Sequence, residues 1–260
     1  KAPSETTVGQ LKPLLLTQSK KLQASLQEIA YDHIPKQFLI SPAASKVVAL
    51  SLKTGLQKVA YIEGAGDNIP QSLTPLGIEV EMLKAKNITL EKLNPFDAVV
   101  VGIRAFNVEE ALAYKNKILW KYVAAGGNLL IQYNTSRRLK TTELTPLKLN
   151  LSRDRVSNEK AEVQIINPKH PILNHPNKIT SQDFEGWVQE RGLYFPNQWD
   201  AQFTPLLQMN DAGESPKKGS LLVAPYGKGR IVYTGLSFFR QLPAGVPGAY
   251  RLFFNLIAKP

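Results

Sequence analysis

The sequence of 260 residues contains no cysteine and only three histidines. Without thiols, a disulfide framework and a thiolate metal site are both excluded. No stretch approaches the roughly 18 consecutive apolar residues that a membrane-spanning helix needs, and no secretory signal pattern is visible. The chain opens at Lys1 rather than at a methionine, so we expect it to be part of a longer protein.

The net charge of +11 raises the question of a nucleic-acid partner. However, the positive charge is spread along the whole chain, and only short pairs such as Arg137–Arg138 and Lys217–Lys218 adjoin. Isolated pairs of this kind are typical of a solvated surface. The sequence therefore predicts no nucleic-acid partner. Since 43% of the residues are hydrophobic, it also predicts a chain that buries a full core.

Residues 1–45 are predicted to form a helical arm or linker ahead of a domain over residues 46–260. Apolar residues recur at mostly helical spacing between residues 8 and 30, with an interruption at Pro13. These apolar positions are Val8, Leu11, Leu15, Leu22, Leu26 and Ile29. Because a lone helix of this length is marginal in water, we expect it to pack on the domain or on a neighbouring subunit.

From about residue 58, short apolar strands alternate with helices. Strands are expected at 59–63, 78–83, 96–102 and 129–133, with helices at 71–76 and 108–124. This order predicts an α/β protein with right-handed crossovers and a doubly wound, mainly parallel sheet. The pattern loosens beyond residue 140. Further strands are expected at 163–166, 220–224 and 230–234, before a closing helix at 248–258.

The strand predicted at 129–133 runs into Asn134, Thr135 and Ser136 without a cysteine or flanking glycines. A nucleophile elbow needs such glycines, and a Thr or Ser nucleophile also needs a histidine folded against it. The candidate histidines, His170 and His175, lie in a proline-rich loop with no carboxylate pattern that would complete a metal site. The sequence therefore predicts no catalytic residue and no metal.

A cofactor site is also not expected. Gly64 and Gly66 follow a predicted strand, as in a dinucleotide-binding fingerprint, but Ile69 occupies the position of the third glycine. A tight turn between strand and helix explains this pair of glycines better.

Ligands of an open, doubly wound sheet collect outside the carboxyl ends of its strands. At this edge the candidate ligand-binding residues are Glu63, Asp67, Arg104, Asn107, Asn134 and Arg137. The arginines suit a carboxylate or phosphate, and the remaining polar groups suit hydroxyls. The alternative is that Arg104 and Arg137 neutralise Glu63 and Asp67 inside an empty crevice.

The stretch from Trp187 to Trp199 mixes aromatic rings with carboxylates and amides, a combination that suits a sugar ring. We include both tryptophans among the candidate ligand-binding residues and expect the stretch to cover the carboxyl edge as a wall. Ordinary core packing is the alternative interpretation. The predicted ligand is a carbohydrate or a small anion.

Four segments together carry a family resemblance: residues 96–102, 122–131, 169–172 and 226–235. Their combination resembles the class I glutamine amidotransferase-like superfamily, specifically its trehalose-utilisation-type branch, over roughly residues 55–258. Residues 240–252 are similar to the C-terminal region of large bacterial PIG-L/LmbE-type proteins, which carry a zinc-dependent N-acetyl-sugar deacetylase domain upstream. The resemblance implies a flavodoxin-like three-layer fold and a deacetylase domain in the same parent chain.

Two departures from these families bear on activity. Active amidotransferases use an elbow cysteine and a later histidine–glutamate pair, and neither exists here. The deacetylase signature is His-Pro-Asp-Asp, whereas His170 and Pro171 are followed by Ile172 and Leu173. We interpret the chain as a non-catalytic accessory or ligand-binding domain of a carbohydrate-active, periplasmic or exported protein. The alternatives are a weak Ser/Thr hydrolase at the carboxyl edge of the sheet and a structural oligomerisation module.

Overall fold

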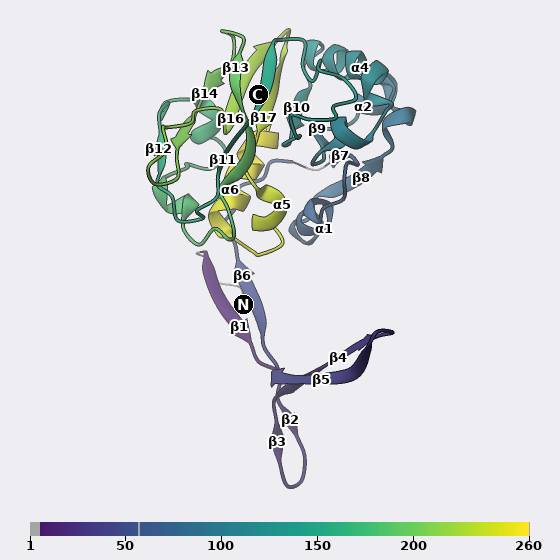
Figure 1. Cartoon of the computed structure of the whole chain (residues 1–260), viewed down its shortest axis with the longest axis vertical. Coiled ribbons are helices and arrows are strands. Elements are labelled where there is room, and N and C mark those ends of the chain that lie inside the picture. Colours follow the sequence, from purple (N-terminus) through teal and green to yellow (C-terminus); the bar gives the residue numbers. More distant parts are fainter. Residues whose placement is uncertain (1–5, 57, 260) are drawn as a thin grey trace. The chain divides into compact units, whose positions relative to one another are not determined.

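The computed structural model describes residues 6–56 and 58–259, and the chain divides into two compact units, residues 1–51 and 52–260. The C-terminal unit is built on a seven-stranded sheet in the order β14-β16-β17-β10-β9-β7-β8 (Figure 1). These strands are β7 (Lys58–Ile62), β8 (Glu79–Leu83), β9 (Ala98–Val101), β10 (Asn128–Ile131), β14 (Thr204–Pro205), β16 (Leu221–Tyr226) and β17 (Gly229–Thr234). The five strands from β17 to β8 run parallel, whereas β16 and β14 are antiparallel to their neighbours.

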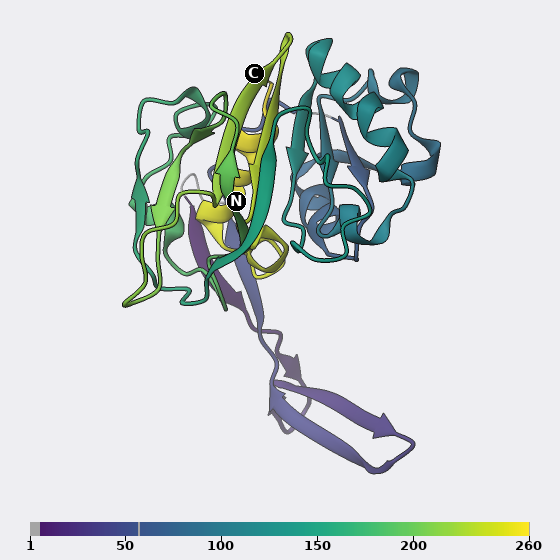
Figure 2. The same ribbon diagram turned by 45° about the horizontal axis from the view of Figure 1, so that its top comes forward.

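Helices cover both faces of this sheet (Figure 2). The α-helices are α1 (Ile69–Leu73), α2 (Leu90–Leu93), α3 (Ala105–Val108), α4 (Leu112–Ala124), α5 (Phe238–Gln241) and α6 (Pro247–Ile257). Leu129 and Ile131 of β10 share a buried cluster with Leu119 of α4. Asn128 points to the opposite face because side chains alternate along a strand, and its Nδ2 donates to the carbonyl oxygen of Leu256 in α6 at 3.0 Å. The mainly parallel sheet and its two helical layers are compatible with a flavodoxin-like fold.

The remaining strands of this unit form two antiparallel pairs. They are β11 (Leu149–Val156) with β13 (Gly192–Trp199), and β12 (Val163–Ile165) with β15 (Leu207–Met209). Four short 3₁₀ helices complete it: η1 (Thr74–Leu76), η2 (Ala85–Asn87), η3 (Pro171–Leu173) and η4 (Ser181–Phe184). The β11–β13 pair contains register shifts, and sequence periodicity predicted neither of its strands.

The N-terminal unit consists of strands, so the helix predicted over residues 8–30 is wrong. The strands are β1 (Thr7–Leu11), β2 (Leu15–Leu16), β3 (Lys21–Leu22), β4 (Ala24–Tyr31), β5 (Ile34–Pro42) and β6 (Ser45–Ala49). Strand β1 pairs with β6, β2 with β3, and β4 with β5, always antiparallel. Residues 1–5 of the predicted arm lie outside the described residues.

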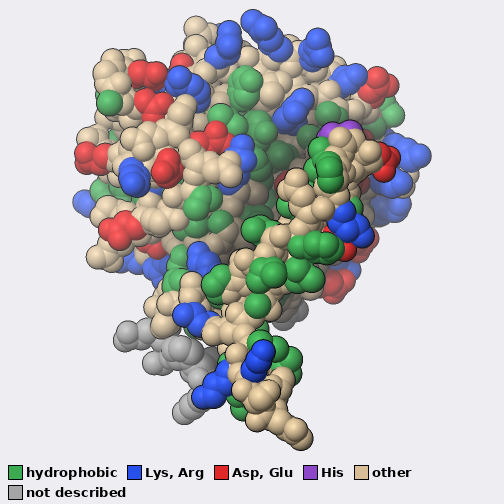
Figure 3. Space-filling view, turned by 60° about the horizontal axis from the view of Figure 1, so that its bottom comes forward, with side chains coloured by type: hydrophobic (Ala, Val, Ile, Leu, Met, Phe, Trp, Pro, Cys, Tyr) green, Lys and Arg blue, Asp and Glu red, His purple; other side chains and the backbone are tan. Residues whose placement is uncertain are grey.

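Two local features explain the strands of this unit. Pro13 would remove a helical hydrogen bond, and a turn at residues 17–20 is closed by the Thr17 Oγ1, which accepts from the Lys20 N–H at 2.9 Å. In the β4–β5 hairpin, Leu26 lies opposite Ile40, and Phe38 lies on the same face. These three side chains are exposed, and Figure 3 shows hydrophobic side chains at the surface of this unit.

None of the helices in the described part of the chain has both the length and the apolar character needed to cross a membrane.

Candidate functional site

Three loops meet at the carboxyl edge of the parallel strands. The loop after β7 contacts the loop after β9 through the Ala65 N–H, which donates to the Ile103 carbonyl oxygen at 2.9 Å. The Arg104 N–H in turn donates to the Tyr133 carbonyl oxygen, after β10, at 2.8 Å. Gly64 permits the first contact, because a Cβ there would lie 2.2 Å from the Ile103 oxygen. The edge predicted for ligand binding is thus assembled from these loops.

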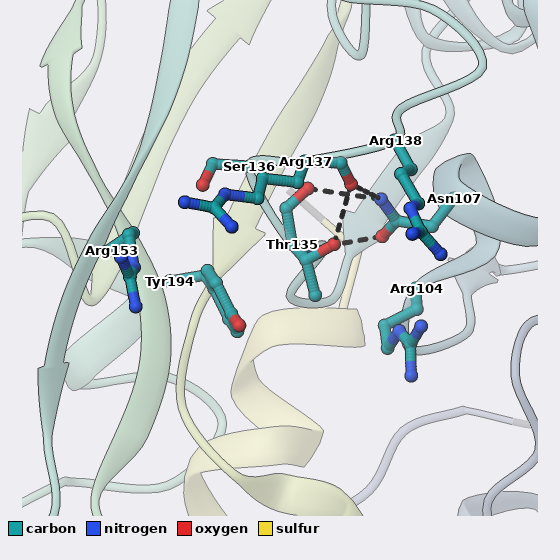
Figure 4. Close-up of a pocket in the computed structure, with 8 residues that line it drawn as sticks. All are labelled: Arg104, Asn107, Thr135, Ser136, Arg137, Arg138, Arg153 and Tyr194. Atoms are coloured by element: carbon teal, nitrogen blue, oxygen red, sulfur yellow. Dashed lines mark hydrogen bonds between the residues drawn. The ribbon is translucent and has the colours of Figure 1, made fainter.

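A hollow of about 320 Å³ opens beside these loops (Figure 4). It is lined by Arg104, Asn107, Thr135, Ser136, Arg137, Arg138, Arg153 and Tyr194. Four of these eight residues are arginines and none carries a carboxylate. Within residues 6–56 and 58–259, no carboxylate forms an ion pair with any of the four guanidinium groups. We call this hollow the arginine pocket. Its uncompensated charge favours anions, and guanidinium groups can hold a carboxylate or phosphate through paired hydrogen bonds.

The loop that carries Arg137 is fixed by Asn107, a nearly buried residue of α3. Asn107 Oδ1 accepts from the Thr135 N–H at 2.9 Å, and its Nδ2 donates to the carbonyl oxygens of Thr135 and Arg137 at 3.1 and 3.0 Å. The Thr135 hydroxyl also donates to the Arg137 carbonyl oxygen at 2.9 Å (Figure 4). Asn107 was predicted to bond ligand hydroxyls. Its side-chain amide instead forms hydrogen bonds that position this loop.

The backbone of the arginine pocket adopts unfavourable conformations at three positions. Arg104, Arg138 and Tyr194 have φ values of 54°, 57° and 51°, in the left-handed region. Among the described residues other than glycine, Gln189 is the fourth with positive φ. Each such residue costs on the order of 1 kcal/mol. Backbone strain of this kind concentrates at functional sites, where the surrounding structure holds it in place.

Tyr194 forms an aromatic wall of the pocket. Its ring stacks on that of Tyr133 with the centroids 6.3 Å apart and the planes 8° from parallel. Burial raises the pKa of Tyr133, although nearby Arg104 opposes the shift. The Tyr133 phenol therefore stays neutral at physiological pH and leaves the positive charge of the arginines uncompensated.

The structure uses three other predicted site residues elsewhere. Asn134 is buried, and its Oδ1 accepts from the Phe106 N–H at 2.9 Å. Asp67 accepts from the Tyr61 hydroxyl at 2.6 Å, and Glu63 is exposed outside the pocket lining. In the described chain, neither Glu63 nor Asp67 pairs with Arg104 or Arg137, so the proposed neutralisation of these arginines is not observed.

The two predicted tryptophans do not form a wall over the arginine pocket. Trp187 is buried, its Nε1 donates to the Asp183 carbonyl oxygen at 3.0 Å, and its ring lies beside that of Phe238. Trp199 packs partly on the core and lines a separate hollow of about 590 Å³. From the stretch that they bound, only Tyr194 reaches the arginine pocket.

Sequence reasoning missed two arginines of the pocket. Arg138 adjoins the predicted Arg137, so that pair in the sequence was an available signal. Arg153 carries no such signal, because the pairing of β11 with the distant β13 brings it to the site. Figure 4 shows Arg153 on a strand across from Arg104, with Tyr194 and Arg137 between them.

The lining contains nucleophile types but no partner that would activate them. Thr135 and Ser136 carry hydroxyls, yet no histidine or carboxylate lines the pocket. His170 instead caps η3, where its Nδ1 accepts from the Ile172 N–H at 3.3 Å. Among residues 6–56 and 58–259, no three His, Asp or Glu side chains are grouped to hold a metal ion. The arrangement is suited to binding an anion.

No family model matches the chain, and no curated protein matches it. Among solved structures, a cytoplasmic protein of Salmonella typhimurium LT2 is similar with a TM-score of 0.51 and 14% identity, over 98% of this chain and 97% of that one. PurLQS of Thermotoga maritima has a TM-score of 0.51 and 11% identity, over 78% of this chain and 98% of that one. A ThuA-like protein of Bacteroides uniformis has a TM-score of 0.46 and 11% identity, over 80% and 91% of the two chains.

The chain has a glutamine amidotransferase-like fold. At these low identities the likeness concerns the fold alone. Membership of the expected superfamily therefore remains a prediction from the sequence.

Proposed function

We propose that the C-terminal unit is a non-catalytic binding domain whose arginine pocket holds a carboxylate- or phosphate-bearing molecule. The observation that carries this proposal is the set of four arginines around one hollow of about 320 Å³ without a carboxylate. Positive charges held close together repel one another, so the arrangement costs free energy until an anion neutralises it. The strained backbone at Arg104 and Arg138 supports the same conclusion, since strain of this kind collects at ligand sites.

Binding is better supported than the alternative of a Ser/Thr hydrolase. A hydroxyl nucleophile needs a neighbouring base, and arginine stays protonated at any physiological pH. The Thr135 hydroxyl already donates to the Arg137 carbonyl oxygen, and no side chain in the lining is placed to remove the proton of Ser136. Hydrolysis at either residue would therefore need a base from outside the pocket.

The wider setting is also a proposal. We infer a doubly wound domain of the trehalose-utilisation-type branch, serving as an accessory domain of an exported PIG-L/LmbE deacetylase-type protein. The four sequence segments named above and the tail at 240–252 support this setting. Reading the parent gene upstream of Lys1 tests it, because a His-Pro-Asp-Asp segment followed by a distal histidine is expected there.

A structural role in oligomerisation is a second candidate function, for the N-terminal unit. The exposed Leu26, Phe38 and Ile40 on one face of the β4–β5 hairpin favour it. A two-stranded sheet is marginal in water without further burial of its apolar face. Deleting residues 1–40 tests this role. If the sedimentation coefficient and the melting temperature of the protein stay unchanged, the N-terminal unit is only a linker.

Anion titration tests the binding function. Isothermal titration with glucuronate and with glucose 6-phosphate is expected to show saturable binding that weakens as salt rises. Arg104→Ala should lower the affinity about tenfold or more, as loss of a charge-assisted pair does. Lys117→Ala is the matched control, because it removes one exposed positive charge from α4, outside the pocket. No binding, or binding indifferent to Arg104, would contradict the proposal.

A further inference from the structure

Arg153 of β11 lines both the arginine pocket and the hollow of about 590 Å³. Strand β13 also lines both hollows: Tyr194 lines the arginine pocket, and Asn197 and Trp199 line the larger hollow. We call the larger hollow the Trp199 groove. Because Arg153 borders both spaces, the two hollows adjoin, and a ligand longer than a single anionic group can occupy them together.

The Trp199 groove differs from the arginine pocket in its chemistry. Its lining contains Trp199, the exposed Asn197, the acidic Asp154 and Glu214, and the basic Arg153, Arg155, Lys217 and Lys218. Glu214 forms ion pairs with Lys217 and, at 3.3 Å, with Arg155. These partners, Lys217 first, lower the pKa of Glu214 and keep its carboxylate ionised. The groove therefore offers both acceptors and donors beside an aromatic residue.

Such a mixed lining suits a hydroxyl-rich ring, because a hydroxyl both donates and accepts hydrogen bonds. Sugar hydroxyls donate to carboxylate and amide oxygens, and the C–H face of a sugar ring packs on an indole.

We propose that the two hollows together bind an acidic oligosaccharide. Its anionic sugar unit occupies the arginine pocket, a neighbouring neutral sugar unit lies against Trp199, and Arg153 bonds at the junction. This inference rests on the proposed anion-binding function and adds to it the substrate class and a second subsite. Whether the anionic group is a carboxylate or a phosphate is distinguished by the probes below.

The test compares ligands of increasing length by isothermal titration. The probes are glucuronate, glucose 6-phosphate, xylotriose, and a trisaccharide of one glucuronate and two xyloses. The acidic trisaccharide is expected to bind about tenfold tighter than glucuronate, since it adds a stacked ring and hydrogen bonds. Xylotriose should bind at least tenfold more weakly than the acidic trisaccharide. Tighter binding of glucose 6-phosphate than of glucuronate would identify phosphate as the preferred anionic group.

Variants separate the two subsites. Two variants alter the Trp199 groove: Asn197→Ala, and Trp199→Phe, which keeps an aromatic ring against the core. Each should weaken binding of the trisaccharide about three- to tenfold, as loss of one contact does, and leave binding of glucuronate unchanged. Arg104→Ala should weaken both ligands, and Lys117→Ala neither. The trisaccharide, but not glucuronate, should also change the tryptophan fluorescence, and Trp199→Phe should abolish that change.

The possible failures are distinguishable. Equal affinities for glucuronate and the trisaccharide would overturn the second subsite while leaving the anion pocket in place. Absence of binding by all four probes would overturn both proposals. Tighter binding of an oligothymidylate than of the acidic trisaccharide would overturn the assignment to an oligosaccharide.

Discussion

The side-chain amide of Asn107 forms hydrogen bonds with both the backbone N–H and the backbone carbonyl group of Thr135. Its Oδ1 accepts from the Thr135 N–H at 2.9 Å, while its Nδ2 donates to the Thr135 carbonyl oxygen at 3.1 Å. A side-chain amide used in this way imitates a backbone pairing between two strands. The pair connects α3 to the loop after β10, and so ties the fold of the sheet edge to the position of Arg137.

Asn107→Leu tests this connection with little change in volume. The leucine can neither accept from the Thr135 N–H nor donate to the carbonyl oxygens of Thr135 and Arg137, so three hydrogen bonds are lost. We expect the free energy of unfolding to fall by about 2–4 kcal/mol, measured by urea denaturation followed by circular dichroism. Ser136→Ala removes a hydroxyl from the same loop and should change stability by less than about 0.5 kcal/mol. Equal denaturation midpoints for Asn107→Leu and the native chain would show that these hydrogen bonds of Asn107 are not needed.

Arg104→Gly should raise stability and weaken anion binding together. Glycine adopts the φ of 54° found at this position without the steric cost that a Cβ carries. The change also removes one of the mutually repelling charges of the arginine pocket. We expect a gain of about 1 kcal/mol from the backbone, together with glucuronate binding weakened about tenfold or more. Arg104→Ala separates the two effects, because it removes the charge but keeps the Cβ. A less stable glycine variant would contradict the assignment of strain to this residue.

The parallel strands of the sheet could be predicted because each is marked by a pattern within a short stretch of sequence. Strands β7, β9 and β10 are short apolar runs closed by turns, and the chain order then sets the carboxyl edge. Arg104 and Arg137, predicted at that edge, both line the arginine pocket. The sequence could not predict that the Asn134 side chain is buried and accepts from the Phe106 N–H. Sequence patterns do not specify which side-chain amides form hydrogen bonds with the backbone.

The parts that failed depend on contacts between distant residues. Leu26 and Ile29 are three residues apart, a spacing that fits a helix, yet both lie in strand β4, which pairs with β5. A short run of apolar residues does not distinguish the 3.6-residue period of a helix from the two-residue period of a strand. Arg153 enters the site only because Leu149 pairs with Trp199 some fifty residues later, through a ladder with register shifts. Trp187, read as a ligand residue, is held in the core by Phe184 and Phe238.

Gly64→Ala tests whether close approach of the loops after β7 and β9 builds the carboxyl edge. The added Cβ would lie 2.2 Å from the Ile103 carbonyl oxygen, so one of the two loops must shift. We expect a loss of about 2–3 kcal/mol in the free energy of unfolding and weaker glucuronate binding. Gly66→Ala is the matched control. Its φ is +94° but nothing lies within 4 Å, so it should cost about 1 kcal/mol through backbone strain alone. Equal losses in the two variants would refute the role of the Gly64 contact.

His170 should make the stability of the C-terminal unit depend on pH. Burial lowers its pKa below 6.5, and Arg230 adds to the effect, so the folded chain binds this proton less readily than the unfolded chain does. The contribution of His170 is therefore complete above about pH 6.5, declines as pH falls through that value, and levels off below the folded pKa. Protonation would also remove the Nδ1 acceptor that caps Ile172.

Urea denaturation at pH values from 8 to 5 measures this effect. His170→Asn keeps a capping side chain without a titrating group, so its stability should fall less between pH 7 and pH 5 than that of the native chain. His33→Asn, in the N-terminal unit, controls for the loss of a histidine and should retain the native slope. If His170→Asn also retains that slope, the pH dependence comes from other groups, and the buried imidazole contributes nothing measurable to it.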